Sequence, residues 1–442
     1  MAKGFAAVPR AASYVLADAT IPAVLVDGFT ARADGDGLIA ADITIKDGAI
    51  ARIDDAGRRT SLPKLDLDGA MVWPCFVDMH THLDKGHIWP RQANPDGTFM
   101  GALNAVDDDR RRNWKARDVA ARMDFAIRSA YAHGTALIRT HIDSAAPQHK
   151  ISWPVFTEMR ERWEGKVDLQ AVSIVSIEAF RDEKYADELA DLIAESRGVL
   201  GAVTYPMHDI DRLIEDAMLR AANRGLDLDF HVDETGDPAS NTLRAIADAA
   251  LRTKFPGRIV TGHCCSLSTQ DEAEADATMD RVAEAGIAVV SLPMCNMYLQ
   301  DRDASRRSTP VRRGVTLLRE LAVAGVPVAV ASDNTRDPFY AYGDLDPLEV
   351  FREGTRILHL DHPQDEAWSW VRAVTTSAAA IAGFAHTAQV VPGASADLVL
   401  FRARDWTELL SRPQSDRMVL RAGAPIDTTL PDYRELDDLM EA

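Results

Sequence analysis

The feature that most limits the fold of this chain is a regular alternation of apolar runs of strand length with amphipathic helical segments. Several helical segments end at a glycine just before the next apolar run, as helices followed by strands commonly do. The alternation recurs about eight times in the middle of the chain, which predicts an α/β fold, a closed (β/α)₈ TIM-like barrel. The expected strands span residues 71–80, 135–141, 167–175, 199–204, 226–231, 258–263, 288–292 and 327–332.

The two ends of the chain show a different pattern, with short strands separated by turn signals. Residues 41–46 alternate, and Asp47-Gly48 predicts a hairpin turn before 49–53; residues 396–401 and 418–426 continue this style. Neither end could build its own core, so we expect one small β-sandwich domain made from both termini. The expected domain limits are 1–72 and 388–442 for the two parts of the β domain and 73–387 for the barrel.

An open, doubly wound sheet is the alternative fold. When such a sheet binds a dinucleotide, a glycine fingerprint follows its first strand, and this chain has none there.

Composition excludes several classes of protein. The chain has 442 residues, with 49 basic and 68 acidic side chains and a formal net charge of −19. Such a charge repels phosphate backbones and anionic membranes, so a nucleic acid is not an expected partner. There is no apolar run of about 18 residues, so no membrane span is expected. Four cysteines are too few for a disulfide framework, which favours the cytoplasm.

The residues that carry chemistry stand at the carboxyl ends of the expected strands, where a barrel places its active site. His80 and His82 end the first strand, His231 the fifth and His263 the sixth, and Asp333 follows the eighth. Alternate residues of a strand point the same way, so His80 and His82 can converge on one ion. A single histidine is more often a surface or core residue, and an aspartate after a strand is usually a helix cap. Five such residues at strand ends together predict a metal centre.

This ordered set resembles the amidohydrolase superfamily over nearly the whole chain, and the segment 392–400 resembles the superfamily's return into the small β domain. More narrowly, the chain resembles the cytosine deaminase branch. The resemblance implies a metal-dependent enzyme that removes the amine of a heterocyclic base by hydrolysis and releases ammonia. The matching stretches are His80-Thr-His-Leu-Asp84, Arg139-Thr-His-Ile-Asp143, His231-Val-Asp-Glu234, Ser332-Asp-Asn-Thr-Arg-Asp-Pro338 and the insert 296–314.

The resemblance and the residues together favour one metal ion. In the two-metal members of the superfamily, a lysine at the end of the fourth strand bridges the ions, and residues 198–210 of this chain contain no lysine. The expected ligands are His80, His82, His231 and Asp333, with a water. Three imidazoles and a carboxylate suit Zn²⁺ or Fe²⁺ better than Mg²⁺ or Ca²⁺, and Mn²⁺ stays open.

Three residues have expected catalytic roles. Hydrolysis needs hydroxide at neutral pH, which a divalent cation supplies by lowering the pKa of a water, and Asp333 is expected to accept the proton. Glu234 matches the glutamate that acts as proton shuttle in deaminases of this family, so we expect it to protonate a ring nitrogen. On its own, a glutamate there is also compatible with a stabilising acid in the first turn of a helix. His263 is expected to orient the hydroxide and stabilise its charge.

The expected substrate contacts depart from those of a cytosine deaminase. Ser176 stands where the resemblance expects a glutamine that reads the pyrimidine edge, and Asn334 stands where it expects an aspartate. Lys85 matches a variant that acts on triazine rings, and we expect it to hold a substrate carbonyl. Phe339 is a candidate wall for a planar ring. These differences favour a small neutral ring other than cytosine, such as isocytosine, a triazine or a pterin-like base.

Two other functions stay open. The same site could open a cyclic amide or imide, although a glutamate at position 234 argues against this. A non-catalytic binding protein should have lost a ligand or the acid, and none is missing. Members of the branch are often oligomers, so a homo-oligomer is also open. The charged stretch 107–113 is expected to form a solvated loop or the start of a helix.

Overall fold

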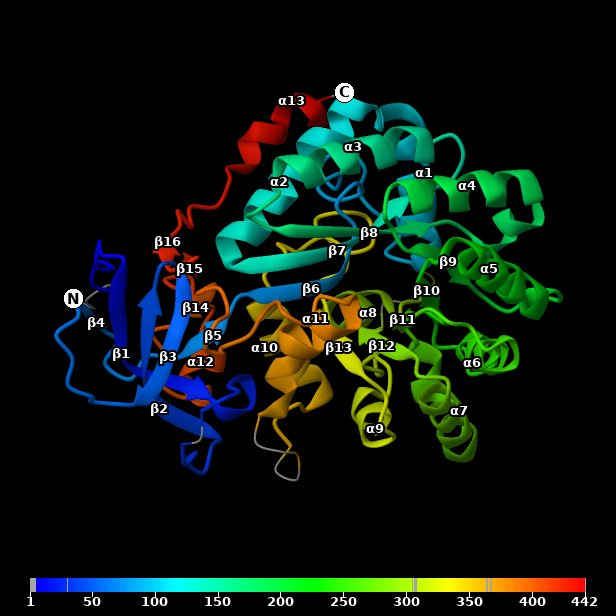
Figure 1. The fold of residues 1–442 in the computed structure, drawn as a ribbon. Coiled ribbons are helices and arrows are strands. Elements are labelled where there is room, and N and C mark those ends of the chain that lie inside the picture. The colour runs from blue at the N-terminus through cyan, green and yellow to red at the C-terminus, as the bar shows by residue number, and fades with distance from the viewer. Residues whose placement is uncertain are drawn as a thin grey trace. The chain divides into compact units, whose positions relative to one another are not determined.

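The computed structural model describes residues 5–29, 31–303, 305, 308–362, 365 and 368–441. It shows a mixed α/β protein whose chain divides into two compact units (Figure 1). The first unit contains Met1–Val77, Ser129–Leu137 and Asp346–Leu430, and the second contains Asp78–Arg128, Ile138–Leu345 and Pro431–Ala442. Among the described residues, no helix has the length and apolar character needed to cross a membrane.

The second unit contains a five-stranded parallel sheet in the order β13-β12-β11-β10-β9. The side chains of β10 and β11 are all buried, as expected for strands covered on both faces, which therefore read as apolar runs in the sequence. Parallel pairing brings the carboxyl ends of these strands to one edge. The strands are β9 (Leu200–Thr204), β10 (Leu228–Val232), β11 (Ile259–His263), β12 (Ala288–Ser291) and β13 (Val328–Val330).

A three-stranded sheet has the order β6-β7-β8, formed by β6 (Phe76–Thr81), β7 (Thr135–Asp143) and β8 (Asp168–Ile174). Isolated parallel bridges continue the pairing beyond this sheet. Val172 pairs with Val199 and Ser176 with Val203, next to β9, while Thr81 pairs with Asp333, just after β13. Each of the eight predicted strands therefore overlaps an observed one.

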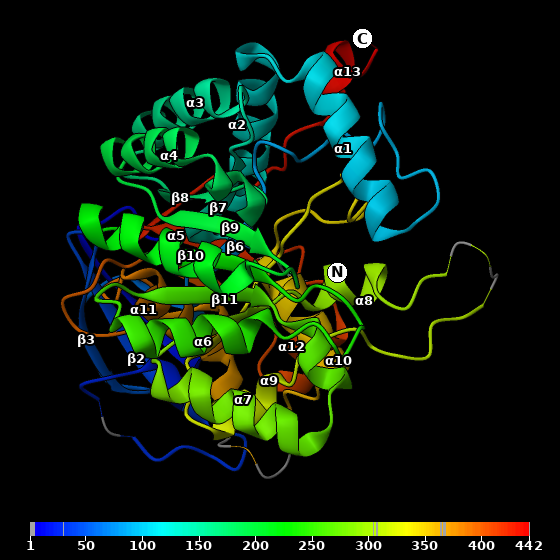
Figure 2. The ribbon, with the colours of Figure 1, turned by 90° about the vertical axis from the view of Figure 1, so that its right-hand side faces the viewer.

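The helices that follow the strands of the second unit pack through one apolar face. In α5 (Ile210–Arg224) the buried residues recur at helical spacing, and Gly225 ends the helix with a φ of 66°. Figure 2 shows α5, α6 (Thr242–Thr253) and α7 (Glu272–Glu284) one after another beside the strands. The remaining helices are α1 (Phe99–Asn113), α2 (Ala116–His133), α3 (His149–Arg162), α4 (Glu183–Glu195), α8 (Pro293–Leu299), α9 (Leu318–Val323) and α13 (Asp437–Met440), with short 3₁₀ turns η2 (Ile177–Arg181), η3 (Cys265–Thr269) and η5 (Tyr433–Leu436).

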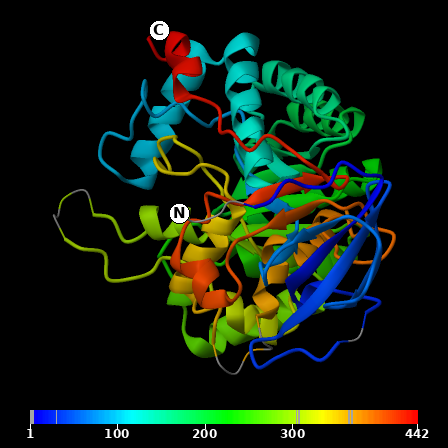
Figure 3. The ribbon, with the colours of Figure 1, turned by 90° about the vertical axis from the view of Figure 1, so that its left-hand side faces the viewer.

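The first unit brings the N-terminal segment Met1–Val77 together with the later segment Asp346–Leu430 (Figure 3), whereas Pro431–Ala442 belongs to the second unit. One sheet has the order β3-β2-β1-β4, and another, β16-β15-β14-β5, pairs the N-terminal strand β5 with the C-terminal strand β14. The predicted hairpin turn joins β2 to β3, with Asp47 and Gly48 at φ 50° and 82°. The elements are β1 (Ser13–Pro22), β2 (Leu38–Lys46), β3 (Ala49–Asp55), β4 (Lys64–Asp66), β5 (Val72–Pro74), β14 (Leu398–Leu400), β15 (Met418–Arg421), β16 (Ala424–Pro425), α10 (Pro347–Leu358), α11 (Thr376–Ala382), α12 (Trp406–Ser411), η1 (Ala23–Leu25) and η4 (Ser369–Val374).

The charged stretch 107–113 forms the last turns of α1, so the expectation of a loop or a helix start is wrong. Its charges pair along the helix, as Asp107 does with Arg110 and Arg111. Residues 1–4 of the expected β domain, and Ala304, Arg306 and Arg307 of the insert 296–314, lie outside the described residues.

Candidate metal centre and active site

Four predicted ligands meet at the carboxyl ends of β6, β10 and β13. The Nε2 atoms of His80 and His231 are 3.1 Å apart, and those of His82 and His231 are 3.4 Å apart. Oδ1 of Asp333 lies 3.2 Å from Nε2 of His82 and 3.7 Å from Nε2 of His80. All four residues are buried. We call His80, His82, His231 and Asp333 the metal cluster.

The backbone around the metal cluster is shaped to bring its side chains close. A Cβ at Gly262 would lie 2.8 Å from the His80 ring, so only glycine leaves room for that imidazole beside β11. Asp333 has a φ of 65°, a left-handed conformation that is unfavourable for a non-glycine residue. Its N–H donates to the carbonyl of His80 at 2.8 Å, which fixes the turn after β13 against the end of β6.

The donor set fits a divalent transition-metal ion. Two ligands about 2.1 Å from a tetrahedral ion lie roughly 3.4 Å apart, close to the distances observed within the metal cluster. Burial, followed by the neighbouring imidazoles, places the pKa values of His80 and His231 well below their ordinary value, so both rings are neutral and can ligate. Oδ2 of Asp333 accepts no hydrogen bond from any described residue, although it is buried.

Glu234 and His263 lie next to the metal cluster and share a hydrogen-bond partner. Nδ2 of Asn296, on α8, is 2.9 Å from Nδ1 of His263 and 3.3 Å from Oε1 of Glu234. Burial and the charge of Asp333 raise the pKa of Glu234 well above its ordinary value, against the opposing charge of Lys85. Burial lowers the pKa of His263 to about 4. The raised pKa favours the protonated carboxyl group of Glu234, and the lowered pKa favours a neutral imidazole at His263.

The loop that carries Glu234 is held by the preceding residue. The Asp233 carboxylate accepts hydrogen bonds from the hydroxyls of Ser240 and Thr242, both at 2.7 Å, and from the N–H groups of Thr242 and Leu243 at 3.0 and 2.9 Å. It thereby binds the loop to the amino end of α6, where exposed N–H groups favour an anion. Glu234 is positioned by this anchor.

Three of the four expected substrate contacts lie in this region. Nζ of Lys85 is 4.3 Å from the centre of the Phe339 ring, a cation–π contact, and both residues are largely buried. Nδ2 of Asn334 donates to Oδ1 of Asp333 at 2.9 Å. The described contacts of Ser176 are with Tyr205, 2.8 Å between the hydroxyls, and with Glu178, and none of them reaches the metal cluster.

Sequence reasoning missed a fifth histidine of this site. His141 lies near the carboxyl end of β7, and one of its ring nitrogens lies within 4.8 Å of ligand atoms of His80, His82 and His231. Its ring is 3.8 Å from that of His80, centre to centre, and its Nε2 is 3.4 Å from Oδ1 of Asp229. The strand-end rule that identified the other histidines also applies to His141.

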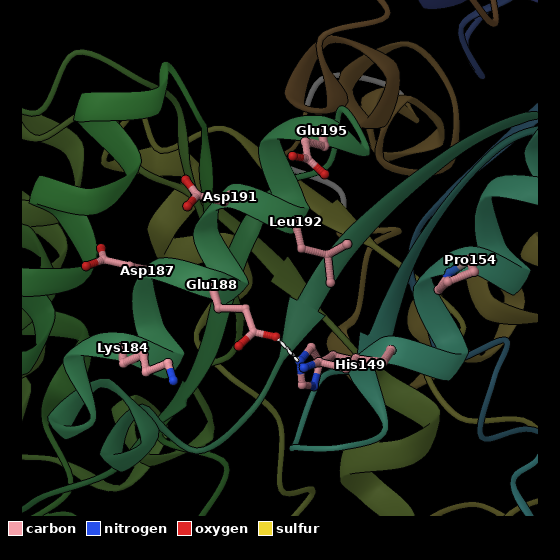
Figure 4. Close-up of a pocket in the computed structure, with 9 residues that line it drawn as sticks. His149, Pro154, Lys184, Asp187, Glu188, Asp191, Leu192 and Glu195 are labelled. Atoms are coloured by element: carbon pink, nitrogen blue, oxygen red, sulfur yellow. Dashed lines mark hydrogen bonds and ion pairs between the residues drawn. The ribbon is translucent and has the colours of Figure 1, made fainter.

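A groove between α3 and α4 forms a cavity away from the metal cluster in the described part of the chain (Figure 4). Its volume is about 730 Å³, and Nε2 of His149 points toward Oε1 of Glu188 at 3.4 Å. It carries both signs of charge and contains none of the predicted site residues, so it is not the candidate active site. Its lining residues are His149, Lys150, Pro154, Lys184, Asp187, Glu188, Asp191, Leu192 and Glu195.

Comparisons with known proteins identify a relative along the whole chain and solved structures of similar fold. The chain is 58% identical to the pterin deaminase of Rhizobium rhizogenes over the whole length of both chains. Its fold matches the crystal structure of 5-methylcytosine deaminase from Klebsiella pneumoniae with a TM-score of 0.80, 22% identity and coverage of 95% and 98% of the two chains. It also matches N-isopropylammelide isopropylaminohydrolase from Burkholderia multivorans, with a TM-score of 0.72, 25% identity and coverage of 95% and 100%.

The family itself is identified from the sequence. Residues 160–427 match the amidohydrolase family, and the 58% identity to a full-length relative extends the match to the rest of the chain. The resemblance drawn from the strand-end histidines is confirmed. This chain belongs to the amidohydrolase family.

Proposed function

We propose that this chain is a pterin deaminase, in which water replaces the exocyclic amino group of a pterin ring and ammonia leaves. The predicted class, a hydrolytic deaminase of a heterocyclic base, is confirmed by the relatives that the chain matches. The observation that carries the choice of ring is the 58% identity to a pterin deaminase over the full length of both chains. Among the rings expected from the sequence, the pterin-like base is therefore favoured over isocytosine and triazines.

The proposed cofactor is one divalent metal ion held by His80, His82, His231 and Asp333, as Zn²⁺ or Fe²⁺, with Mn²⁺ open. The fit of the donor atoms supports this set. When bound, such an ion acts as a Lewis acid and lowers the pKa of a water to near neutrality.

The proposed proton transfers use residues of this chain. Asp333 takes a proton from the attacking water, since its Oδ2 is buried and free of hydrogen bonds from described residues. Glu234, protonated because of its raised pKa, gives its proton to a ring nitrogen and makes the adjacent carbon electrophilic. His263, a neutral imidazole fixed by Asn296, orients the water and stabilises the charge that develops on its oxygen. Asp333 then passes its proton to the amine, which leaves as ammonia, and the remaining hydroxyl proton returns to Glu234 as the carbonyl forms.

The proposed substrate contacts are Lys85, Ser176, Asn334 and Phe339. Lys85 and Phe339 form one unit, since the ammonium group lies over the ring; the ammonium can hold a substrate carbonyl while the phenyl ring covers the base. The amide of Asn334 can both donate and accept hydrogen bonds. Its Oδ1 accepts none from the described part of the chain and is therefore available to a substrate. Ser176 lies two residues after the end of β8, and its hydroxyl acts together with that of Tyr205.

The proposed architecture is a closed (β/α)₈ barrel over 73–387, with a small β-sandwich formed by 1–72 and 388–442. The bridges Thr81–Asp333 and Val172–Val199, which continue the pairing on both sides of the five-stranded sheet, support closure. The pairing of β5 with β14 supports a β domain made from both termini.

The test is ammonia release by the purified protein loaded separately with zinc, iron or manganese. Pterins, cytosine, isocytosine and aminotriazines form the panel, and we expect the kcat/KM for a pterin to exceed the others by at least about tenfold. A metal-loaded protein that releases no ammonia from any of them contradicts the proposal. Ring-opened product without ammonia would instead identify the alternative, a cyclic amide or imide amidohydrolase. Gel filtration of the same preparation tests the expected homo-oligomer.

A further inference from the structure

A buried thiol lies inside the candidate active site, where the proposed deamination gives it no role. Cys295, on α8, is completely buried, and its Sγ lies within 4.8 Å of a carboxylate oxygen of Glu234 and one of Asp333. Nδ2 of Asn334 is 3.3 Å from the same sulfur. A thiol and two carboxylates are therefore gathered around one point.

This group of ligands is separate from the metal cluster except for Asp333. Oδ1 of Asp333 faces His82 and the amide of Asn334, at 3.2 and 2.9 Å. Oδ2 of the same carboxylate is buried and accepts no hydrogen bond within the described residues. A carboxylate oxygen of Asp333 lies within 4.8 Å of the Cys295 sulfur and of a Glu234 oxygen, so Asp333 belongs to both groups of ligands.

The chemistry of this second group differs from that of the first. A thiolate with two carboxylates selects Zn²⁺ or a softer ion such as Cd²⁺, whereas Mg²⁺ and Ca²⁺ prefer oxygen ligands alone. The three ligands together carry more negative charge than a divalent ion neutralises. Lys85, whose charge acts on Glu234, is a nearby cation that offsets part of this excess negative charge.

We propose that Cys295, Glu234 and Asp333 form a second, inhibitory site for a thiophilic divalent cation, beside the metal cluster. An ion bound there is coordinated by the Glu234 carboxylate and so replaces the proton that this residue donates to the substrate. The inhibition, but not the binding, rests on the function proposed above.

The test adds Cd²⁺ to the holoenzyme that already holds one equivalent of its metal. We expect a second equivalent of bound metal, an ultraviolet thiolate-to-cadmium charge-transfer band, and a fall in ammonia release of at least about tenfold. The band reports on this site, because the metal cluster contains no thiol. Cys295→Ala should keep the first equivalent, lose the band, and weaken Cd²⁺ binding beyond the roughly 10–100-fold that loss of an outer partner costs.

Cys265→Ala is the matched control. Burial, followed by the charge of Glu234, raises the pKa of this thiol, but Cys265 is not one of the three ligands. This variant should keep the band. A wild-type protein without the band, or a Cys295→Ala protein that retains it, overturns the proposal. X-ray absorption of the cadmium-loaded wild type needs no variant: one sulfur neighbour is expected, and a shell of nitrogen and oxygen alone overturns the site. A band without activity on any base would refute only the proposed deamination.

Discussion

Two clusters of buried polar side chains in the second unit differ in whether their polar atoms have hydrogen-bond partners. The first is the metal cluster. The second, which we call the arginine network, consists of Arg91, Asp109, Asp118 and Arg122, and it too is almost completely buried.

The arginine network is saturated. The guanidinium of Arg91 makes two hydrogen bonds to Asp109, at 2.9 and 2.8 Å, and also binds both oxygens of Asp118. Arg122 donates to the same Asp118 oxygen at 2.9 and 2.7 Å. Burial pushes the pKa of Asp118 up, but the two arginines outweigh it and hold the pKa below its ordinary value.

The metal cluster is unsaturated, since it gathers neutral imidazoles and a carboxylate oxygen that has no hydrogen bond from the described residues. Buried polar atoms cost free energy unless something binds them. Two equally buried clusters can therefore be told apart: the paired one stabilises the fold, and the unpaired one is the candidate metal site.

The largest expected effect comes from removing the metal. A chelated protein should lose at least about 10³-fold in ammonia release, because a metal ion contributes several kcal/mol to such a reaction. Far-ultraviolet circular dichroism should not change, because the arginine network needs no ion. Adding back one equivalent of zinc, iron or manganese should restore turnover. Full activity in a protein shown to be metal-free would contradict the assignment of the cluster.

Glu234→Gln should lower kcat by about 10²–10⁴-fold, the usual contribution of a general acid, and leave one equivalent of metal bound. Turnover of pterin and metal content by mass spectrometry give the two readouts. Glu272→Gln, at an exposed position in the first turn of α7, is the control and should behave as wild type. Retained activity in Glu234→Gln would refute its role as proton shuttle.

Arg91→Ala should lower the free energy of unfolding by about 3–5 kcal/mol, because it leaves the buried Asp109 without its arginine and Asp118 with Arg122 alone. Urea unfolding measures the loss. Arg404→Ala, which breaks the exposed pair with Glu408, should cost no more than about 1 kcal/mol. Equal losses in the two variants would mean that the arginine network does not stabilise the fold.

The smallest effect concerns pH. Burial, then the charge of Arg336, lowers the pKa of His87 to about 3. The unfolded chain takes up a proton at this histidine near its ordinary value of about 6.5 and the folded chain does not, so stability falls as the pH drops from about 7 to 5, by roughly 2 kcal/mol. His87→Asn should remove that part of the pH dependence in urea unfolding, since asparagine tolerates the φ of 66° there. An unchanged pH dependence would contradict the buried, neutral state of His87.

Much of the fold and of the candidate metal centre could be predicted from the sequence. Buried parallel strands are continuous apolar runs, so the histidines and the aspartate that follow them mark the strand ends directly. His141 lies near the end of β7 and follows the same rule. It was not predicted as a site residue, because it was considered only as part of the stretch 139–143 that resembles the cytosine deaminase branch.

Other parts could not be predicted, because they depend on tertiary contacts. Cys295 and Asn296 lie on α8. This helix is too short for an apolar periodicity to show which of its faces points toward the site. The charges of residues 107–113 suggest a solvated segment. In the structure Asp109 is buried, because it binds Arg91, which precedes α1, and Trp114, which follows α1. Ser176 was expected to contact substrate from the resemblance alone, and its side chain forms its described hydrogen bonds with Tyr205 and Glu178.

The most direct test of the central claim is an anomalous difference map from crystals of the protein loaded with one equivalent of zinc or iron. The account predicts one strong peak among His80, His82, His231 and Asp333, and none at the arginine network. Bound metal that gives no peak in that cluster, or gives its peak in the groove of His149 and Glu188, would contradict it.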